Sequence, residues 1–306
     1  MTVGVTLDTT GNDLLIDDAV RQAREARACG LTSLWLGQTF GYDSPTLAAL
    51  IGREVPDIQV GSSALPVFGR HPLLVASQAQ TAQAATGGRY NLGLALGTKL
   101  FTEGAFGLPF ERPVARLREF LTALRQLLET GHADYEGELI TARTPKPATV
   151  PGAEPTVPVL VAAMGPQALR VAGRLADGIL PYLAGPRALE EHIVPELTRA
   201  AEEAGRPAPR VVAFVPGVVT QRPDALRAKV YEAFAFYNQI PSYARVIELS
   251  GHSHAADLAV VGDEKDLTET VRRYRDAGAT DVVVSGSELD GDDARLRTWE
   301  VLGELA

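Results

Sequence analysis

The stretch LVAAMGPQALRVAGRLADG, residues 160–178, contains an apolar strand, a Gly165-Pro166 turn and an amphipathic helix in direct succession. Proline suits the first position of a helix, because its φ is already helical and its missing N–H needs no partner. The free amides of Gln167 and Ala168, together with the positive end of the helix dipole, favour an anion such as phosphate. Taken alone, the stretch also fits an ordinary connection between a strand and a helix.

The same unit of strand and helix recurs along the chain in both directions from this stretch. Eight short apolar strands, each followed by a helix over more than 250 residues, are typical of a (β/α)8 barrel. We therefore expect an α/β protein with one TIM-barrel domain spanning residues 1–306. The expected strands are 2–7, 32–36, 57–65, 89–97, 157–162, 178–182, 210–219 and 281–285; the expected helices are 14–29, one from Ser44, 72–86, 111–130, 166–176, 187–204, 222–238, 264–277 and 292–305.

A doubly wound open sheet is the alternative architecture. No strand is followed by G-x-G-x-x-G, which weakens a dinucleotide-binding version of that fold. The Pro-rich piece 144–158 resembles a linker, but it only joins a helix to the next strand. We see no domain boundary.

Composition excludes several classes of partner. The 306 residues carry a net charge of −9 and no basic run, which makes nucleic acid a poor partner. No window approaches 18 apolar residues, so we expect no membrane segment. The N-terminus lacks the pattern of a signal peptide, and the single Cys29 excludes an internal disulfide. These features predict a reduced, cytoplasmic protein.

The chemistry of a barrel belongs at the C-terminal ends of its strands. Those ends hold few acids and bases, and no H-E-x-x-H, carboxylate pair or G-x-S-x-G occurs there. His252 and His254 in GHSH have no evident third ligand, so we predict no metal site. A barrel with one phosphate-type turn and few acid or base groups indicates chemistry carried by a cofactor.

Long segments of the chain resemble the bacterial luciferase-like flavin and deazaflavin oxidoreductases, in the subgroup that uses coenzyme F420. The most specific pieces are RHPLLVASQAQT (70–81), GGRYNLGLALG (87–97) and AAMGPQALRVAGRLADG (162–178). The resemblance runs nearly end to end. It implies a luciferase-like (β/α)8 barrel, a hydride-transferring activity and a homodimer.

The resemblance also implies where the cofactor binds. Backbone amides of the turn after the fifth strand would hold its phosphate, and a cis peptide at Ser63-Ala64 would support one face of the deazaflavin ring. Thr98 stands where some relatives carry glutamate. The implied cofactor-binding residues are Gln38, Ser62, Ser63, Ala64, Thr98, Ala163, Met164, Gly165, Pro166, Gln167 and Ala168.

The catalytic residues are less evident, because Gln38 stands where many relatives have an acidic residue and often a histidine. Glutamine can hydrogen-bond but cannot supply a proton. We therefore expect hydride transfer to be the main event, with Gln38 as a hydrogen-bonding group. The proton would come from solvent, a loop histidine or a tyrosine, and Tyr42 and Tyr182 are the candidate tyrosines. His71, before Pro72, is interpreted as a helix cap. Phe40, Phe101 and His252 are the candidates for the substrate pocket; Phe106 is a further candidate, while Phe234, Phe236 and Tyr237 are interpreted as wall or core.

These residues predict an F420-dependent oxidoreductase that transfers hydride between the deazaflavin and a C=C, C=N or alcohol/carbonyl group. The alternative is an FMN-dependent luciferase-like monooxygenase, and a second alternative is a non-catalytic flavin or deazaflavin binder. The absence of a charged cluster at the strand ends favours a small hydrophobic or heterocyclic substrate.

Overall fold

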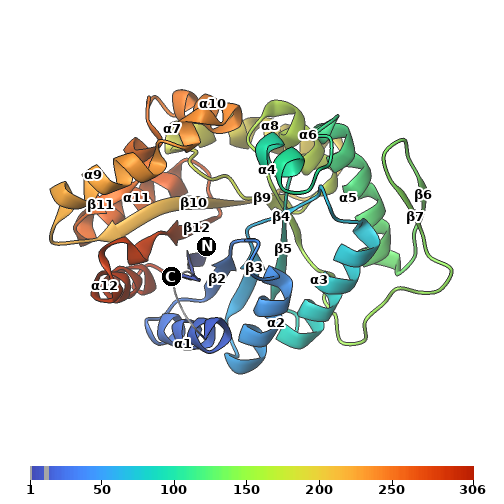
Figure 1. The fold of residues 1–306 in the computed structure, drawn as a ribbon, viewed down its shortest axis with the longest axis horizontal. Coiled ribbons are helices and arrows are strands. Elements are labelled where there is room, and N and C mark those ends of the chain that lie inside the picture. Colours follow the sequence, from blue (N-terminus) through green and yellow to red (C-terminus); the bar gives the residue numbers. More distant parts are fainter. Residues whose placement is uncertain (1, 10–13) are drawn as a thin grey trace.

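The computed structural model describes residues 2–9 and 14–306. Within these residues, eight parallel strands close into a barrel in the order β12, β1, β2, β3, β5, β8, β9, β10, with β10 pairing back to β12. This confirms the predicted TIM barrel (Figure 1). The barrel strands are β1 (Thr2–Thr6), β2 (Ser33–Leu36), β3 (Gln59–Ser62), β5 (Tyr90–Ala95), β8 (Val159–Ala162), β9 (Gly178–Ile179), β10 (Arg210–Val219) and β12 (Asp281–Ser285).

Helices surround the barrel where the apolar periodicity predicts them. They are α1 (Leu15–Ala28), α2 (Ser44–Glu54), α3 (Pro72–Thr86), α5 (Pro113–Thr130), α6 (Pro166–Leu175), α8 (Val194–Glu203), α9 (Pro223–Phe234), α11 (Glu264–Asp276) and α12 (Asp292–Gly303). The helix expected at 187–204 is divided into α7 (Pro186–Ala188), a π-helical turn η1 (Leu189–Ile193) and α8. Pro195 has no N–H for the carbonyl four residues earlier, so the turn before it widens.

Two of the expected strands differ from the structure. The strand expected at 57–65 stops at Ser62, and the chain resumes as the short β4 (Leu65–Pro66), which pairs with β5. The strand expected at 178–182 is shorter, although Tyr182 still forms a parallel bridge with Phe214.

Several short elements lie outside the predicted pattern. They are α4 (Lys99–Gly104), the hairpin β6 (Asp134–Glu136) and β7 (Thr141–Arg143), α10 (Pro241–Leu249), β11 (Val260–Gly262), and the 3-10 turns η2 (Tyr237–Gln239), η3 (Ala255–Leu258) and η4 (Ser287–Asp290). Most of them belong to loops at the C-terminal ends of the strands. They are too short for a periodic apolar pattern.

Large side chains fill the inside of the barrel. The rings of Trp35 and Phe214 meet edge to face, 5.5 Å between centroids, and pack with Leu160, Leu180, Val212 and Val283. We call these six side chains the plug. Gly61 makes room for it, because a Cβ at Gly61 would lie 2.4 Å from the Trp35 ring. The plug fills the interior of the barrel. We call the end of the barrel formed by the C-terminal ends of the strands the mouth.

A polar network joins four strands at the opposite, N-terminal end. Arg210 on β10 donates to Asn91 on β5 at 2.8 Å and pairs with Asp281 on β12 at 3.3 Å. Thr2 on β1 donates to the same carboxylate. Contacts at this end of a barrel serve stability rather than catalysis.

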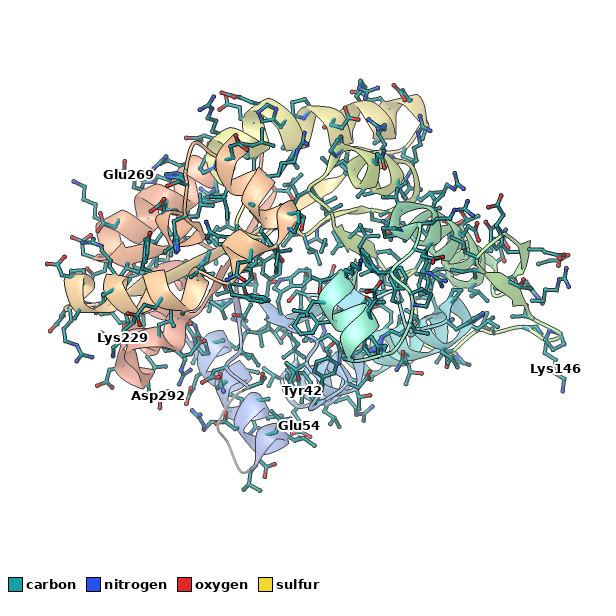
Figure 2. The ribbon with its side chains drawn as sticks, turned by 45° about the horizontal axis from the view of Figure 1, so that its top comes forward. Tyr42, Glu54, Lys146, Lys229, Glu269 and Asp292 are labelled. Carbon is teal, nitrogen blue, oxygen red and sulfur yellow. The ribbon has the colours of Figure 1, made fainter. Side chains whose placement is uncertain are left out.

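The Pro-rich connection and the β6–β7 hairpin lie outside the barrel wall, where the hairpin projects from the right edge of Figure 1. Gln80 on α3 bonds both Ala148 and Val150, and His71 contacts the Thr141 carbonyl at 2.9 Å through Nε2 while its Nδ1 accepts from Leu73. Figure 2 shows Lys146 at the outer tip of this connection. The connection is therefore attached to α3, and His71 is the helix cap that the sequence predicts.

Across residues 2–9 and 14–306, none of the helices has the length and apolar character needed to cross a bilayer.

Candidate functional site

The N-terminus of α6 opens on the mouth without a side-chain cap. Gly165 stands at the N-cap position, and Pro166 begins the helix. Within the described residues, the amides of Gly165, Gln167 and Ala168 have no hydrogen-bond acceptor. A Cβ at Gly165 would meet no atom within 4 Å, so the space in front of these amides is open. The turn offers donors, a helix dipole and room for an anion.

The interruption between β3 and β4 forms the neighbouring part of the mouth. The peptide bond between Ser63 and Ala64 is cis, as the resemblance implies. Ala64 and Ala162 are half-buried and both pack against the Trp35–Phe214 plug, which gives the mouth a floor of small residues. Ser62 is fully buried, with its hydroxyl 3.0 Å from the Tyr90 hydroxyl and from the Gly93 amide. Ser62 thus joins the end of β3 to β5 through its side chain.

Gln38 lies at the end of β2, where its side chain organises its own loop. Its amide group donates to the carbonyls of Thr39 and Tyr42, both at 2.7 Å, and its oxygen accepts from Ser44. These bonds occupy both hydrogens and the oxygen of the amide. Gln38 therefore shapes the β2–α2 connection in this structure.

Tyr42 belongs to the same loop and is labelled in Figure 2. Its hydroxyl donates to the Gly37 carbonyl at 2.7 Å and lies 3.2 Å from the Thr9 hydroxyl at the end of β1. Burial raises the pKa of Tyr42, and the contact with Thr9 opposes this rise. The hydroxyl stays protonated at neutral pH and ties two loops together.

Tyr182 lies on the other side of the mouth, between the plug and a cluster of tyrosines. Its ring meets those of Tyr237 and Tyr243 edge to face, at 5.5 and 6.1 Å between centroids. Ser285 is the last residue of β12. Burial, followed by the neighbouring Tyr237, raises the pKa of Tyr182 well above its ordinary value, while Ser285 opposes this rise.

The phenylalanines predicted for the substrate pocket are brought together above the mouth. Phe40 lies 6.1 Å from Phe101 and 6.0 Å from Phe106, between ring centroids. All three rings are exposed, Phe40 to 72%. Thr98 caps α4 by accepting from the Phe101 amide at 3.3 Å, so it positions this aromatic group.

His252 is placed apart from these residues. It is exposed after α10, and its amide bonds to the carbonyl of Ile247. His254 is stacked on Tyr231 at 3.7 Å and caps η3 with its Nδ1. Among the described residues, no three histidines, cysteines or carboxylates gather as metal ligands.

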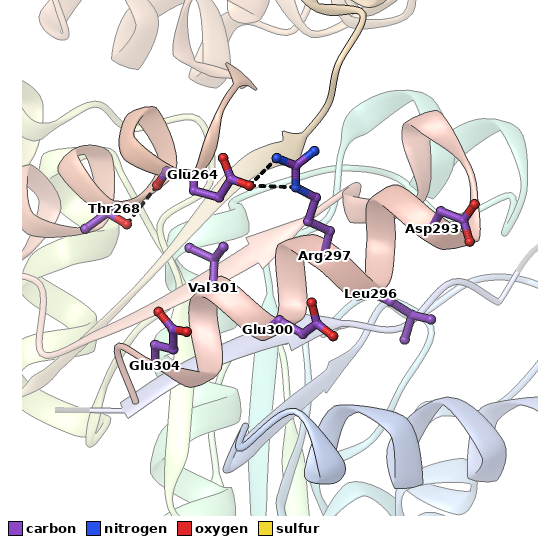
Figure 3. A pocket seen from close by; sticks show the side chains of 8 residues that line it. All are labelled: Glu264, Thr268, Asp293, Leu296, Arg297, Glu300, Val301 and Glu304. Atoms are coloured by element: carbon purple, nitrogen blue, oxygen red, sulfur yellow. Dashed lines mark hydrogen bonds and ion pairs between the residues drawn. The ribbon is translucent and has the colours of Figure 1, made fainter.

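A groove of about 540 Å³ lies elsewhere, on the outer surface between α11 and α12 (Figure 3). The ion pair between Glu264 and Arg297 crosses it, and Glu300 and Glu304 line it with further carboxylates. The groove is remote from the strand ends and from the open amides of α6. We therefore place the candidate site at the mouth.

From the sequence we propose Tyr182 but not the residues that surround it. Ser285 was within reach of the strand-end rule, because it ends an expected strand. Tyr243 lies in a stretch without a predicted element, and Tyr237 was interpreted as wall or core.

The chain matches known proteins over most of its length. A family model described as luciferase-like monooxygenase covers residues 2–281. An uncharacterised protein of Mycobacterium tuberculosis is 31% identical over 220 residues, which span 68% of this chain but only 65% of that protein. The 5,10-methylenetetrahydromethanopterin reductase of Methanopyrus kandleri is 28% identical over 303 residues, 85% of this chain and 84% of the enzyme.

The fold of the chain is similar to that of a solved structure. The coenzyme F420-dependent tetrahydromethanopterin reductase from Methanopyrus kandleri superposes with a TM-score of 0.77 at 23% identity, covering 99% of this chain and 97% of that one. At this identity the likeness concerns the fold.

Proposed function

The chain belongs to the luciferase-like monooxygenase family, and we propose that it is an F420-dependent oxidoreductase that transfers hydride to or from a small organic substrate. The observation that carries the proposal is the uncapped start of α6, open at Gly165, beside a floor of small residues. The reductase of Methanopyrus kandleri supports the choice of F420.

The residues at α6 fit the phosphate of such a cofactor. The amides of Gly165, Gln167 and Ala168 would donate to its oxygens, while Pro166 contributes shape only. Met164 and Ala163 join this turn to β8. Ala163 is buried and Met164 is half-buried. A negative charge at a helix N-terminus is stabilised by roughly 0.3–1 kcal/mol or more from the dipole alone.

The floor of the mouth fits a planar ring. Ala64 and Ala162 present methyl groups above the plug, and the plug keeps water from reaching the ring from below. When bound, F420 supplies the hydride-carrying carbon of its deazaflavin ring. Tyr182 is our choice for the proton donor, because the hydroxyl of Tyr42 is bonded to a backbone carbonyl and Gln38 has no acidic proton.

Phe40 and Phe101 would contact the substrate, with Phe106 alongside, and their exposed rings favour a hydrophobic or heterocyclic molecule. His252 stays a prediction for the rim of the pocket. We also propose a homodimer, for which sedimentation analysis of the purified chain is the test.

The function is tested by titrating purified protein with F420 and, in parallel, with FMN, following cofactor fluorescence. Tight F420 binding with weak FMN binding supports the proposal and justifies a screen of acceptors. Preference for FMN would replace it with an FMN-dependent monooxygenase. F420 binding without turnover of any acceptor would favour a non-catalytic binder.

The variant Gly165→Asp tests the phosphate position itself. Aspartate is a good N-cap, so α6 keeps its stability while the carboxylate occupies the amides and repels phosphate. We expect F420 affinity to fall by at least about tenfold, the equivalent of about 1.4 kcal/mol, with an unchanged melting temperature. Gly165→Asn, a neutral cap of similar shape, should lose less. Full affinity in Gly165→Asp would remove α6 from the site.

A further inference from the structure

Arg70 lies in the connection between β4 and α3, at the mouth, and its side chain is 22% exposed. A guanidinium has five N–H donors. In the described part of the chain, none of those of Arg70 has a hydrogen-bond acceptor, and its Nε is fully enclosed. The carboxylate that pairs with it belongs to Asp43, whose Oδ1 is 3.9 Å from Nη2 and thus too far for a hydrogen bond.

The Asp43 carboxylate is engaged by other donors. Its Oδ2 caps α2 by accepting from the amide and the hydroxyl of Thr46, at 3.1 and 2.7 Å. Its Oδ1 accepts from the Gln78 side chain on α3 at 3.3 Å. Asp43 therefore balances part of the Arg70 charge without satisfying the Arg70 donors.

Other half-buried arginines have what Arg70 lacks. Arg125 donates to both carboxylate oxygens of Asp177, at 3.0 and 3.1 Å. Arg116 also has an enclosed Nε without a partner, but its guanidinium lies over the Phe68 ring, 4.9 Å from the ring centre. Among the described residues, Arg70 has neither a hydrogen-bonded carboxylate nor a ring. Because polar groups removed from water without acceptors are costly, an acceptor supplied by a ligand would stabilise this position.

The aromatic rings above the mouth lie next to Arg70. Gly69, the residue before it, is open toward Phe106, because a Cβ at Gly69 would lie 3.6 Å from that ring. Asp43 follows Phe40 by three residues in the connection between β2 and α2. The rings of Phe40 and Phe106 are 6.0 Å apart between centroids. A cation therefore lies beside exposed apolar surface, which suits a molecule with an acidic group on an apolar body.

We propose that Arg70 binds a carboxylate group of the substrate, while Phe40 and Phe106 contact its apolar part. The inference rests on the proposed function and adds the substrate class, an acid that carries the reacting C=C, C=N or C=O group on an aromatic or other apolar body. A carboxylate matches the planar fork of a guanidinium and accepts from two of its N–H groups at once. This contact would hold the substrate in one orientation at the mouth.

The first test uses the apo-protein and a matched pair of probes, cinnamate and cinnamamide. Both have a phenyl ring and a C=C group, but only cinnamate is charged at neutral pH. Isothermal titration calorimetry should show that wild type binds cinnamate more tightly by about tenfold or more, because hydrogen bonds between charged groups are the stronger ones. Equal binding of the two probes, or binding of neither, would overturn the inference.

Three variants relate this preference to Arg70. Arg70→Gln should bind the two probes about equally, whereas Arg70→Lys, which keeps the charge but loses the fork, should retain part of the preference. Lys99→Gln removes a charge from α4, two residues from Phe101, and should keep the wild-type preference, because Lys99 is exposed and paired with Glu103. An equal loss in Arg70→Gln and Lys99→Gln would assign the preference to the overall charge of this surface and overturn the inference.

The melting temperature distinguishes a ligand site from a structural ion pair. Arg70→Gln gives up only the 3.9 Å pair with Asp43, so its melting temperature should stay close to that of wild type. Cinnamate should raise the melting temperature of wild type but not of Arg70→Gln, because a ligand stabilises the folded state that binds it. A lower melting temperature in Arg70→Gln with unchanged cinnamate binding would assign Arg70 to the contact with Asp43 instead.

The inference and the proposed function fail in different ways. If F420 binds wild type and Arg70→Gln equally and only the variant loses the preference for cinnamate, both stand. If Arg70→Gln loses F420 affinity but keeps the preference, Arg70 holds an acidic group of the cofactor and the inference is wrong. If wild type does not bind F420, the proposed function fails, and calorimetry on the apo-protein still decides whether Arg70 binds a carboxylate.

Discussion

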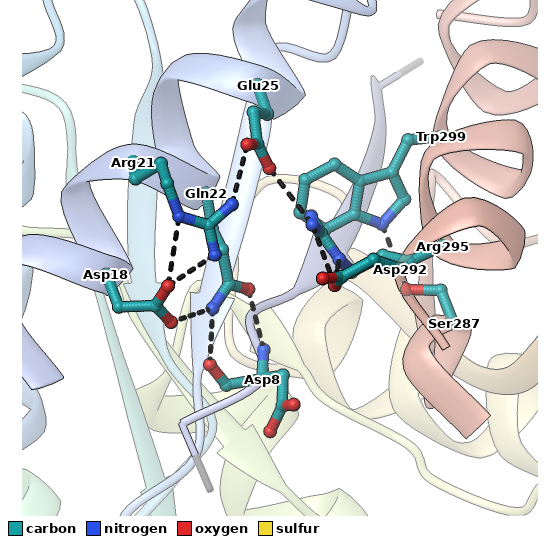
Figure 4. Close-up of polar contacts among 9 residues, drawn as sticks. All are labelled: Asp8, Asp18, Arg21, Gln22, Glu25, Ser287, Asp292, Arg295 and Trp299. Carbon is teal, nitrogen blue, oxygen red and sulfur yellow. Dashed lines mark hydrogen bonds and ion pairs between the residues drawn. The ribbon is translucent and has the colours of Figure 1, made fainter. Parts of the chain in front are cut away.

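A single arginine, Arg295, stabilises the contact between the first and last helices of the barrel. It is 2% exposed, and its guanidinium lies 4.5 Å from the centre of the Trp299 ring. It donates to Glu25 on α1 at 3.0 Å and to Asp292 at 3.2 Å (Figure 4). Arg21 pairs with the same Glu25 but is 49% exposed in its side chain.

The difference in burial predicts different effects for the two arginines. Arg295→Met should lower the free energy of unfolding by about 2 kcal/mol, because it removes the charged hydrogen bonds of a buried guanidinium. Arg21→Met should cost less than about 1 kcal/mol, since exposed ion pairs contribute little. Urea denaturation of both variants gives the comparison. Equal losses would show that burial does not decide the contribution of Arg295.

At the scale of an element, the β6–β7 hairpin depends on one carboxylate. Glu119 on α5 is 3% exposed and accepts from the amides of Leu139 and Ile140 at 2.8 and 2.9 Å, and from Glu138 at 3.3 Å. These amides form the turn between the strands. The hairpin has few buried side chains of its own, so its position follows from Glu119.

Glu119→Ala should therefore lower the free energy of unfolding by about 1–3 kcal/mol, because it leaves these amides unpaired. Hydrogen exchange across residues 134–143 should accelerate in this variant. Glu129→Ala, on the same helix and 46% exposed in its side chain, is the control and should have little effect on either measurement. Unchanged exchange in Glu119→Ala would contradict this account of the hairpin.

The hairpin also marks the limit of what the sequence predicts. The helix around Leu117, Leu121 and Leu124 follows from its apolar period, because a whole face is buried. Strands of three residues with mostly exposed side chains have no such period, so the sequence does not predict β6 and β7. The hairpin is positioned by its tertiary contact with Glu119 instead.

The candidate site, like the fold, can be predicted from the sequence only in part. Tyr182 and the α6 turn follow from the position of strand ends in a parallel barrel. Tyr237 and Tyr243 come from η2 and α10 in the long segment between β10 and β11, and only the three-dimensional path of that segment brings them to Tyr182. Gln38 was expected near the cofactor, but its bonds to its own loop depend on backbone geometry that the sequence does not specify.

At the scale of the whole molecule, the two ends of the barrel have different roles, one in binding and the other in stability. The mouth has open amides and exposed aromatic rings, whereas the N-terminal end holds the network of Thr2, Asn91, Arg210 and Asp281. The plug of Trp35 and Phe214 separates them. Substitutions at the N-terminal end should therefore change stability without changing cofactor affinity at the mouth.

Asp281, 6% exposed, provides the test of this separation. Burial favours its neutral form, but the Thr2 bond and the charge of Arg210 outweigh burial and lower the pKa of Asp281. A lowered pKa means that the ionised carboxylate stabilises the fold above its unfolded pKa of about 4 and that this contribution is lost as the pH falls through the folded pKa. Asp281→Asn should thus cost about 2 kcal/mol at pH 7.

The pH dependence then distinguishes a charge effect from a packing effect. The difference in unfolding free energy between wild type and Asp281→Asn should be constant from about pH 7 to pH 5 and should shrink below about pH 4, as the wild-type carboxylate takes up its proton. Denaturant titrations at each pH measure it, and F420 affinity at pH 7 should be the same in both proteins. A difference independent of pH would assign Asp281 to packing alone, and a loss of F420 affinity would mean that the plug does not isolate the mouth from the N-terminal end.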